Sequence, residues 1–239
     1  MNRPLEPDVL RSFLELEVVR VLRRLQGRET FLHRAPDGRP IVVKRSVPGA
    51  RPGGRREHEA LVRLAEQGFP VPAALGFAQG PRGSVVAMER VAHKETARDV
   101  LCRADATERR ALLARCADLA AALHARGWCH RDLYAHHLLV RETDGELVLI
   151  DVGRARRARL PRRRWYVKDV GALLSSLPHE VGRGERLRCV ARYLDARGVT
   201  VPAARRRFAR AAFAKAARIA RRIPRDERAP AADGSGAAR

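Results

Sequence analysis

Two short apolar runs, LLVR and LVLI, are joined by a D-G turn signal within residues 138–150. Runs of this length around Asp-Gly predict a β-hairpin. The outgoing strand directly follows His137, and the returning strand directly precedes Asp151. A hairpin therefore brings His137 and Asp151 side by side at one edge, with Asp132 on the loop next to them.

The side chains gathered at this edge favour a magnesium site. In proteins Mg²⁺ binds one or two carboxylates and often completes its shell with substrate phosphates. Two carboxylates and an imidazole suit that role. A metal hydrolase is an alternative, with ligands drawn from His130, Asp132, His136 and His137.

Strand patterns lead the chain. The turn signal Pro-Asp-Gly at 36–38 predicts a hairpin of residues 28–34 with 39–45. A helix is expected over 55–67, and a short buried strand over 84–89.

Helical patterns follow after residue 90. Asp105 and Glu108 have the spacing of a capping box ahead of a long amphipathic helix, and the pattern is helical again from Lys168 onward. This order predicts an α+β, bilobal architecture: a small antiparallel-sheet lobe over 1–90 and a larger helical lobe over 91–222. The small-residue tail at 223–239 is expected to be disordered.

The net charge of +22 in 239 residues is unusually high. Such a charge points to an anionic partner: nucleic acid, phospholipid headgroups or a phosphorylated substrate. Only four of the 49 basic residues are lysines. A lysine in this chain is therefore a place where an ammonium is needed instead of a guanidinium. The four are Lys44, Lys94, Lys168 and Lys215.

Cysteine spacing and hydropathy give the expected compartment. The four cysteines lie far apart with no CxxC pair, which is typical of reduced thiols. The N-terminus has no signal-peptide pattern, and no apolar stretch approaches about 20 residues. We expect a soluble, cytoplasmic protein, with peripheral docking on a membrane surface left open.

Four elements resemble a protein kinase in type, order and spacing. HRDL at 130–133, with a ligand five positions after Asp132, resembles the catalytic loop H-R-D-L-x-x-x-N. Asp151-Val-Gly stands where D-F-G would, and Ile-Val-Val-Lys44 resembles the strand lysine of V-A-I-K. Glu57 or Glu59 could pair with that lysine, and the inward face of the helix favours Glu57.

The details resemble the bacterial lipopolysaccharide core kinases, the family of 3-deoxy-manno-octulosonic acid (Kdo) and heptose kinases. These are compact, protein-kinase-like proteins that carry HRDxYxxH, with His in place of Asn. Here the motif is HRDLYAHH, with His137 at the substituted position. The stretches LIDVGRAR at 149–156 and RWYVKDVGAL at 164–173 are also similar to the family's segments.

The resemblance implies an ATP- and Mg²⁺-dependent kinase that phosphorylates a Kdo or heptose hydroxyl of the lipopolysaccharide inner core. Asp132 would orient the acceptor hydroxyl and take its proton, while Asp151 and His137 would hold metal. Lys44 would neutralise the ATP phosphates, with Glu57 holding it in place. Asp169 resembles the family's helix-start aspartate, which ties down the catalytic loop. By position and residue type, Arg154 and Arg156 are expected to bind the acceptor, Tyr134 either to pack or to contact the acceptor, and His124 and His130 to make scaffold hydrogen bonds.

Two departures refine this interpretation. Only Gly27 precedes the first hairpin, where a kinase has a glycine-rich phosphate loop. Only 17 positions separate Asp151 from Lys168, with no A-P-E stretch, so the platform for a peptide acceptor is absent and a non-protein acceptor is favoured.

Two other functions remain open at this level. A small-molecule phosphotransferase of the aminoglycoside or choline kinase type would share the fold. A basic nucleic-acid-binding protein would explain the charge. It would leave the ordered set Lys44, Asp132 and Asp151 unexplained, and only 5% of the residues are aromatic and available for stacking on bases.

Overall fold

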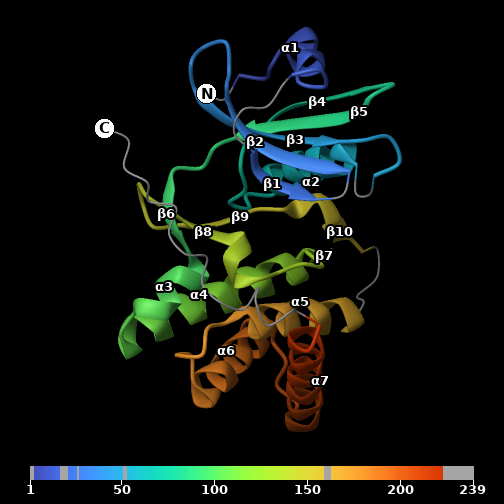
Figure 1. The fold of residues 1–239 in the computed structure, drawn as a ribbon. Helices are drawn as coiled ribbons and strands as arrows, with labels where there is room; N and C mark the ends of the chain where they lie inside the picture. Colours follow the sequence, from blue (N-terminus) through green and yellow to red (C-terminus); the bar gives the residue numbers. More distant parts are fainter. Residues whose placement is uncertain (1–2, 17–20, 26, 51–52, 159–162, 223–239) are drawn as a thin grey trace.

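The computed structural model describes residues 3–16, 21–25, 27–50, 53–158 and 163–222 of the chain. A twisted antiparallel sheet forms one end of the molecule and a group of helices forms the other, with short strands between them (Figure 1). The predicted α+β class and kinase-like arrangement are confirmed, and the tail at 223–239 lies outside the described residues.

The sheet has five antiparallel strands in the order β1-β2-β3-β5-β4. The predicted hairpin around residues 36–38 pairs β2 with β3, and β3 then pairs with β5. The sequence patterns did not identify β1 or β4. The strands are β1 (Val21–Leu25), β2 (Arg28–Arg34), β3 (Pro40–Ser46), β4 (Ala74–Gly80) and β5 (Gly83–Glu89).

Two helices cover opposite faces of this sheet: α1 (Pro7–Ser12) and α2 (Gly54–Glu66). Strand side chains alternate between the faces. Ile41 and Val43 pack in the cluster with α1, while Val42 packs against the cluster that contains α2. The same alternation turns Lys44 toward α2, which decides where its ammonium lies.

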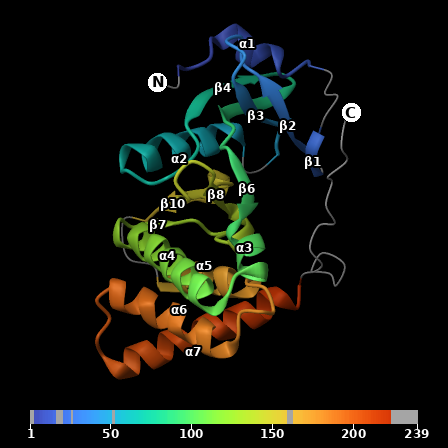
Figure 2. The same cartoon turned by 90° about the vertical axis from the view of Figure 1, so that its left-hand side faces the viewer.

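Short strands connect the sheet to the helices (Figure 2). The predicted hairpin at 138–150 is present as β8 (Leu138–Arg141) and β9 (Leu147–Leu149), and β6 (His93–Thr96) joins it to make a three-stranded sheet. A second small ladder pairs β7 (Trp128–Cys129) with β10 (Arg156–Arg157).

The other end of the molecule is helical. The predicted capping box at Asp105 is confirmed, because its side chain accepts from Thr107 and Glu108 N–H groups. The expected helix start at Lys168 is wrong: α5 already includes Arg163, so Lys168 lies in its second turn. The helices are α3 (Ala97–Arg103), α4 (Ala106–Ala125), α5 (Arg163–Ser176), α6 (Arg183–Ala196) and α7 (Pro202–Ala220).

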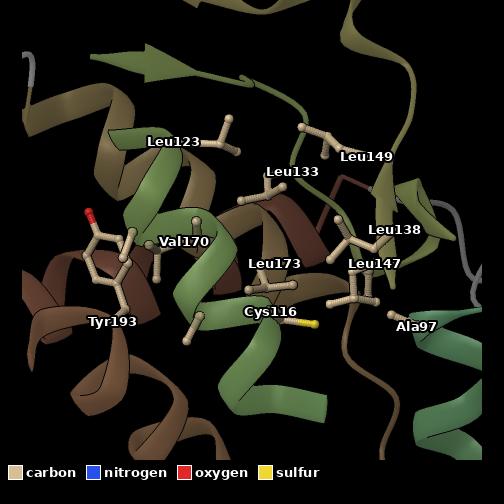
Figure 3. Packing of buried hydrophobic residues seen from close by; sticks show 14 of the residues in the cluster. Ala97, Cys116, Leu123, Leu133, Leu138, Leu147, Leu149, Val170, Leu173 and Tyr193 are labelled. Carbon is tan, nitrogen blue, oxygen red and sulfur yellow. The ribbon is translucent and has the colours of Figure 1, made fainter. Parts of the chain in front are cut away.

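A single apolar core holds these helices against the hairpin. Cys116 of α4, Leu173 of α5 and Leu138 of β8 all point into it (Figure 3). Leu133, from the loop that follows β7, is 1% exposed and lies in the same core. The loop carrying Asp132 is therefore anchored by an apolar neighbour, so it is held in one position.

The apolar face of α7 also packs inward, because Phe208, Ala212 and Ala216 are buried. The four cysteines are free thiols. In the described part of the chain no helix is long and apolar enough to cross a membrane.

Candidate active site

A buried ion pair links the sheet to α2. Lys44 Nζ lies 2.5 Å from Glu57 Oε1, and the Glu57 side chain is only 2% exposed. Glu57 shares the buried face of α2 with Leu61 and Leu64, whereas Glu59 is exposed. The structure therefore pairs the strand lysine with Glu57, the favoured one of the two candidates.

The same ammonium reaches across to the end of β9. Lys44 Nζ lies 3.2 Å from Asp151 Oδ1, a contact between residues 107 positions apart. Burial alone would lower the pKa of Lys44, but the charges of Glu57 and Asp151 outweigh it and raise that pKa. Burial would likewise raise the pKa of Asp151, but Lys44 and His137 bring it well below its usual range. Both groups are charged at neutral pH.

Asp151 and His137 lie side by side, as the hairpin geometry predicts. The Ile150 N–H donates to the His137 carbonyl oxygen, which closes the hairpin at its open end. His137 Nε2 lies 3.7 Å from Asp151 Oδ2, and Nδ1 lies 2.9 Å from the Asp132 carbonyl oxygen. A carbonyl oxygen only accepts, so Nδ1 carries a proton. In the neutral ring, Nε2 then presents its lone pair toward the Asp151 side.

Asp132 lies between two cations. Lys168 Nζ is 3.3 Å from its Oδ1, and Arg154 Nη1 is 3.1 Å from the same oxygen. The Asp132 side chain is 15% exposed and that of Lys168 19% exposed. Burial lowers the pKa of Lys168 in spite of the opposing effect of Asp132.

Asp169 of α5 holds the loop that carries Asp132. It is fully buried, and its carboxylate accepts the backbone N–H groups of His130 (2.8 Å) and Arg131 (2.7 Å). His124 Nε2 also lies 3.2 Å from Asp169 Oδ2. His130 Nε2 donates to the Ile150 carbonyl at 3.1 Å, so this ring ties the loop to the end of β9. His124, His130 and Asp169 therefore have the geometry of scaffold residues.

The backbone is strained at two positions of this site. Among the described residues, Arg131 (φ 74°) and Asp151 (φ 56°) are the only non-glycine residues with positive φ. Such conformations persist where the surroundings enforce them, and they gather at functional sites. The Asp169 carboxylate accepts the Arg131 N–H and so enforces the conformation of Arg131. Asp151 directly follows the hydrogen bond from the Ile150 N–H to the His137 carbonyl.

The other expected site residues surround this centre. Tyr134 stacks on exposed His136, with ring centroids 5.2 Å apart. Arg154 contacts Asp132 directly, while Arg156 is exposed on β10. Of the arginine run that follows Asp151, positions 159 and 162 lie outside the described residues.

Sequence reasoning did not assign Lys168 to the site. Its signal was present, because Lys168 is one of only four lysines in the chain. Its approach to Asp132 depends on where α5 crosses the loop, a tertiary contact that no local pattern encodes.

The donor set fits a magnesium ion that keeps phosphate ligands. Among the described residues, no group of three or more His, Cys, Asp or Glu side chains could hold a metal ion. This finding gives no support to the hydrolase alternative. Mg²⁺ that is shared with a nucleotide needs only one or two carboxylates from the protein. Asp151, ionised and partly exposed beside His137, has that character.

The chain is similar in sequence to known lipopolysaccharide kinases. The model of the lipopolysaccharide kinase (Kdo/WaaP) family matches residues 43–193. The lipopolysaccharide core heptose(I) kinase WaaP of Escherichia coli K12 is 31% identical over 188 residues, which cover 69% of this chain and 70% of the relative. The protein of the same name from Pseudomonas aeruginosa is 31% identical over 207 residues, covering 73% and 76%.

Two solved structures of similar fold are aminoglycoside phosphotransferases. An aminoglycoside-3'-phosphotransferase of type VIII has a TM-score of 0.62 at 21% identity, covering 86% of this chain and 97% of that one. APH(3'')-Id from Streptomyces rimosus has a TM-score of 0.57 at 17% identity, covering 81% and 91%. Likeness at these identities shows the fold alone.

Proposed function

The chain belongs to the lipopolysaccharide kinase (Kdo/WaaP) family, and we propose that it transfers the γ-phosphate of ATP to heptose I of the lipopolysaccharide core. The family gives the reaction class, phosphoryl transfer to a core sugar. Heptose as the acceptor comes from the printed names of the relatives. The observation that carries the proposal is the position of Lys44, whose ammonium contacts both Glu57 and Asp151.

Lys44 would neutralise charge on the ATP phosphates. Its raised pKa keeps it an ammonium at any physiological pH. Glu57 is buried and fixed on α2, so it would hold the ammonium at the phosphates. Phosphoryl transfer depends mainly on positioning and charge stabilisation.

Asp132 would orient the acceptor hydroxyl and accept its proton as the oxygen attacks the γ-phosphorus. The bond to phosphorus forms as the bond to the β,γ-bridging oxygen breaks, which leaves ADP. Lys168 and Arg154 flank the carboxylate and would stabilise negative charge that develops between acceptor and phosphate.

Asp151 and His137 would hold Mg²⁺. The ion, when bound, would supply positive charge to the phosphate oxygens. Asp151 is in the αL conformation and its carboxylate contacts Lys44 at 3.2 Å, so both groups would act on the same phosphates.

Acceptor choice is the experiment that tests the proposal. Transfer from γ-labelled ATP with Mg²⁺ would be compared among purified lipopolysaccharide core, an aminoglycoside, a basic protein and no acceptor. We expect label in the core alone. Label in the aminoglycoside alone would favour the small-molecule phosphotransferase instead, a possibility that the shared fold makes worth including.

We further propose peripheral contact with anionic membrane through α7. Its outward positions carry exposed guanidinium groups, which attract anionic headgroups. They include Arg206, Arg207 and Arg210. Flotation with anionic vesicles should carry the protein upward at low salt and release it at high salt, and failure to float at low salt would contradict membrane contact.

A further inference from the structure

A pocket of about 380 Å³ lies between α5 and α7, and Lys168, which contacts Asp132, is one of its lining residues. Apolar groups form most of its surface, and four cations and an indole are among its lining residues. These five residues are Arg163, Arg164, Trp165, Lys168 and Lys215. Two of the four lysines of the chain therefore line one pocket.

Three of the four cations of this pocket have no ion pair among the described residues. No carboxylate lines it, and Lys168 alone forms an ion pair, with Asp132. Within the described residues, Arg163, Arg164 and Lys215 make no ion pair. Like charges around one cavity repel each other, and a bound anion removes that repulsion.

Lys215 is held in the pocket wall by close helix packing. A Cβ added at Gly171 of α5 would lie 2.8 Å from Lys215 Cβ and Cγ. The lysine stem therefore lies against the backbone of α5, and the residue is only partly exposed. A stem fixed in this way loses less conformational entropy when its ammonium binds a ligand than a free surface lysine does.

Trp165 links the pocket to the loop of Asp132. The guanidinium of Arg131 lies 4.5 Å from the ring centroid, and that of Arg164 lies 5.0 Å from it. Arg131 precedes Asp132, and its Nε is buried without a hydrogen-bond partner among the described groups. Lys168 makes the second link, because it lines the pocket while its ammonium lies 3.3 Å from Asp132.

We propose that this pocket binds an anionic group of the acceptor, a carboxylate or a phosphate carried close to the hydroxyl that is phosphorylated. The inference rests on the proposed function and adds an acceptor subsite to it. Guanidinium and ammonium groups bind both kinds of oxyanion through charge-assisted hydrogen bonds. Substrates whose only polar groups are neutral hydroxyls leave these cations uncompensated.

Direct binding tests the pocket without catalysis. Trp165 lines the pocket while Trp128, the other tryptophan, is 3% exposed, so tryptophan fluorescence reports on the site. The probes are free Kdo, glucose 6-phosphate and glucose at constant ionic strength. A response to Kdo alone assigns a carboxylate as the bound group. A response to glucose 6-phosphate alone assigns a phosphate, and a response to both sugars shows that the pocket binds either group. An equal response to glucose overturns the proposal.

The variants are Lys215→Gln and Arg164→Gln, with Lys94→Gln as the matched control. Lys94 is exposed on β6 and pairs with Glu142, away from the pocket. Loss of one charge-assisted hydrogen bond should weaken binding of the anionic sugar by about 10- to 100-fold. The Lys94 variant should match the wild type. Wild-type affinity in both pocket variants overturns the proposal.

Kinetics then separate this inference from the proposed function. With lipopolysaccharide core as acceptor, Lys215→Gln should raise the acceptor KM by a similar factor and leave the ATP KM unchanged. An active enzyme with an unchanged acceptor KM contradicts the subsite. A wild type that transfers no phosphate contradicts the proposed function, and the fluorescence titration still decides whether the pocket binds an anion.

Discussion

Replacing Glu57 with Gln isolates the role of the buried ion pair. The substitution removes the charge from a side chain that is 2% exposed and lies 2.5 Å from Lys44. Lys44 keeps Asp151 at 3.2 Å, so its ammonium is not left without a counter-ion. The expected loss of unfolding free energy is therefore that of one charge-assisted hydrogen bond, about 1.5–3 kcal/mol, and not the roughly 3–5 kcal/mol of an orphaned buried charge.

This loss translates into an observable shift. For a chain of this size, each kcal/mol lowers the melting temperature by about 2–4 °C, so we expect roughly 3–12 °C in thermal unfolding. The effect on turnover should be larger. With Asp151 as its only anchor, Lys44 moves toward that carboxylate, and a misplacement near 1 Å costs about 100-fold in rate.

The matched control is Glu59→Gln, a change on the same helix at an exposed position. Circular-dichroism melts and steady-state kinetics of both variants would be compared with the wild type. Glu59→Gln should behave like the wild type in both assays. Equal effects of the two substitutions, or full activity in Glu57→Gln, would refute the argument that Glu57 positions the lysine.

Three further predictions concern the metal, pH and helix packing. Asp151→Asn should lower turnover by about 1000-fold, the equivalent of several kcal/mol of lost charge stabilisation, and Mg²⁺ titrations of activity should no longer restore the wild-type rate. Burial lowers the pKa of His124 from its ordinary 6.5, so the unfolded chain binds the extra proton. As the pH is lowered below 6.5, the unfolding free energy should therefore decrease by up to about 1.4 kcal/mol per pH unit. Urea melts of His124→Gln should show a shallower pH dependence. Gly171→Ala should destabilise by about 1–3 kcal/mol, because its Cβ would meet Lys215 Cβ at 2.8 Å. In contrast, Gly184→Ala on α6 should stabilise by about 0.4–1 kcal/mol in the same melts, since its Cβ meets nothing closer than 3.5 Å.

Local signals in the sequence predict the central part of the site. The D-G turn and its two flanking runs define a hairpin, and hairpin geometry then brings His137 next to Asp151. Strand alternation and helix periodicity similarly direct Lys44 and Glu57 toward each other. Each of these inferences depends only on neighbours along the chain.

Other features depend on contacts that no local pattern encodes. β1 is rich in arginine and β4 contains two glycines, so neither has the apolar alternation of a strand, and pairing with neighbouring strands stabilises them instead. The first turn of α5 has no apolar helical pattern, because the residues before Lys168 are mostly charged or aromatic. The packing of α5 on the loop of Asp132 also decides that Lys168 and Arg154 flank this carboxylate.

The most direct test of the central claim is transfer of labelled phosphate to lipopolysaccharide core by the wild type and by Asp132→Ala. Asp8→Ala is the control, since that side chain is 94% exposed on α1. Our account predicts label in the core with the wild type and the control, and none above background with Asp132→Ala, although the variant still binds ATP. Undiminished transfer by Asp132→Ala would contradict it.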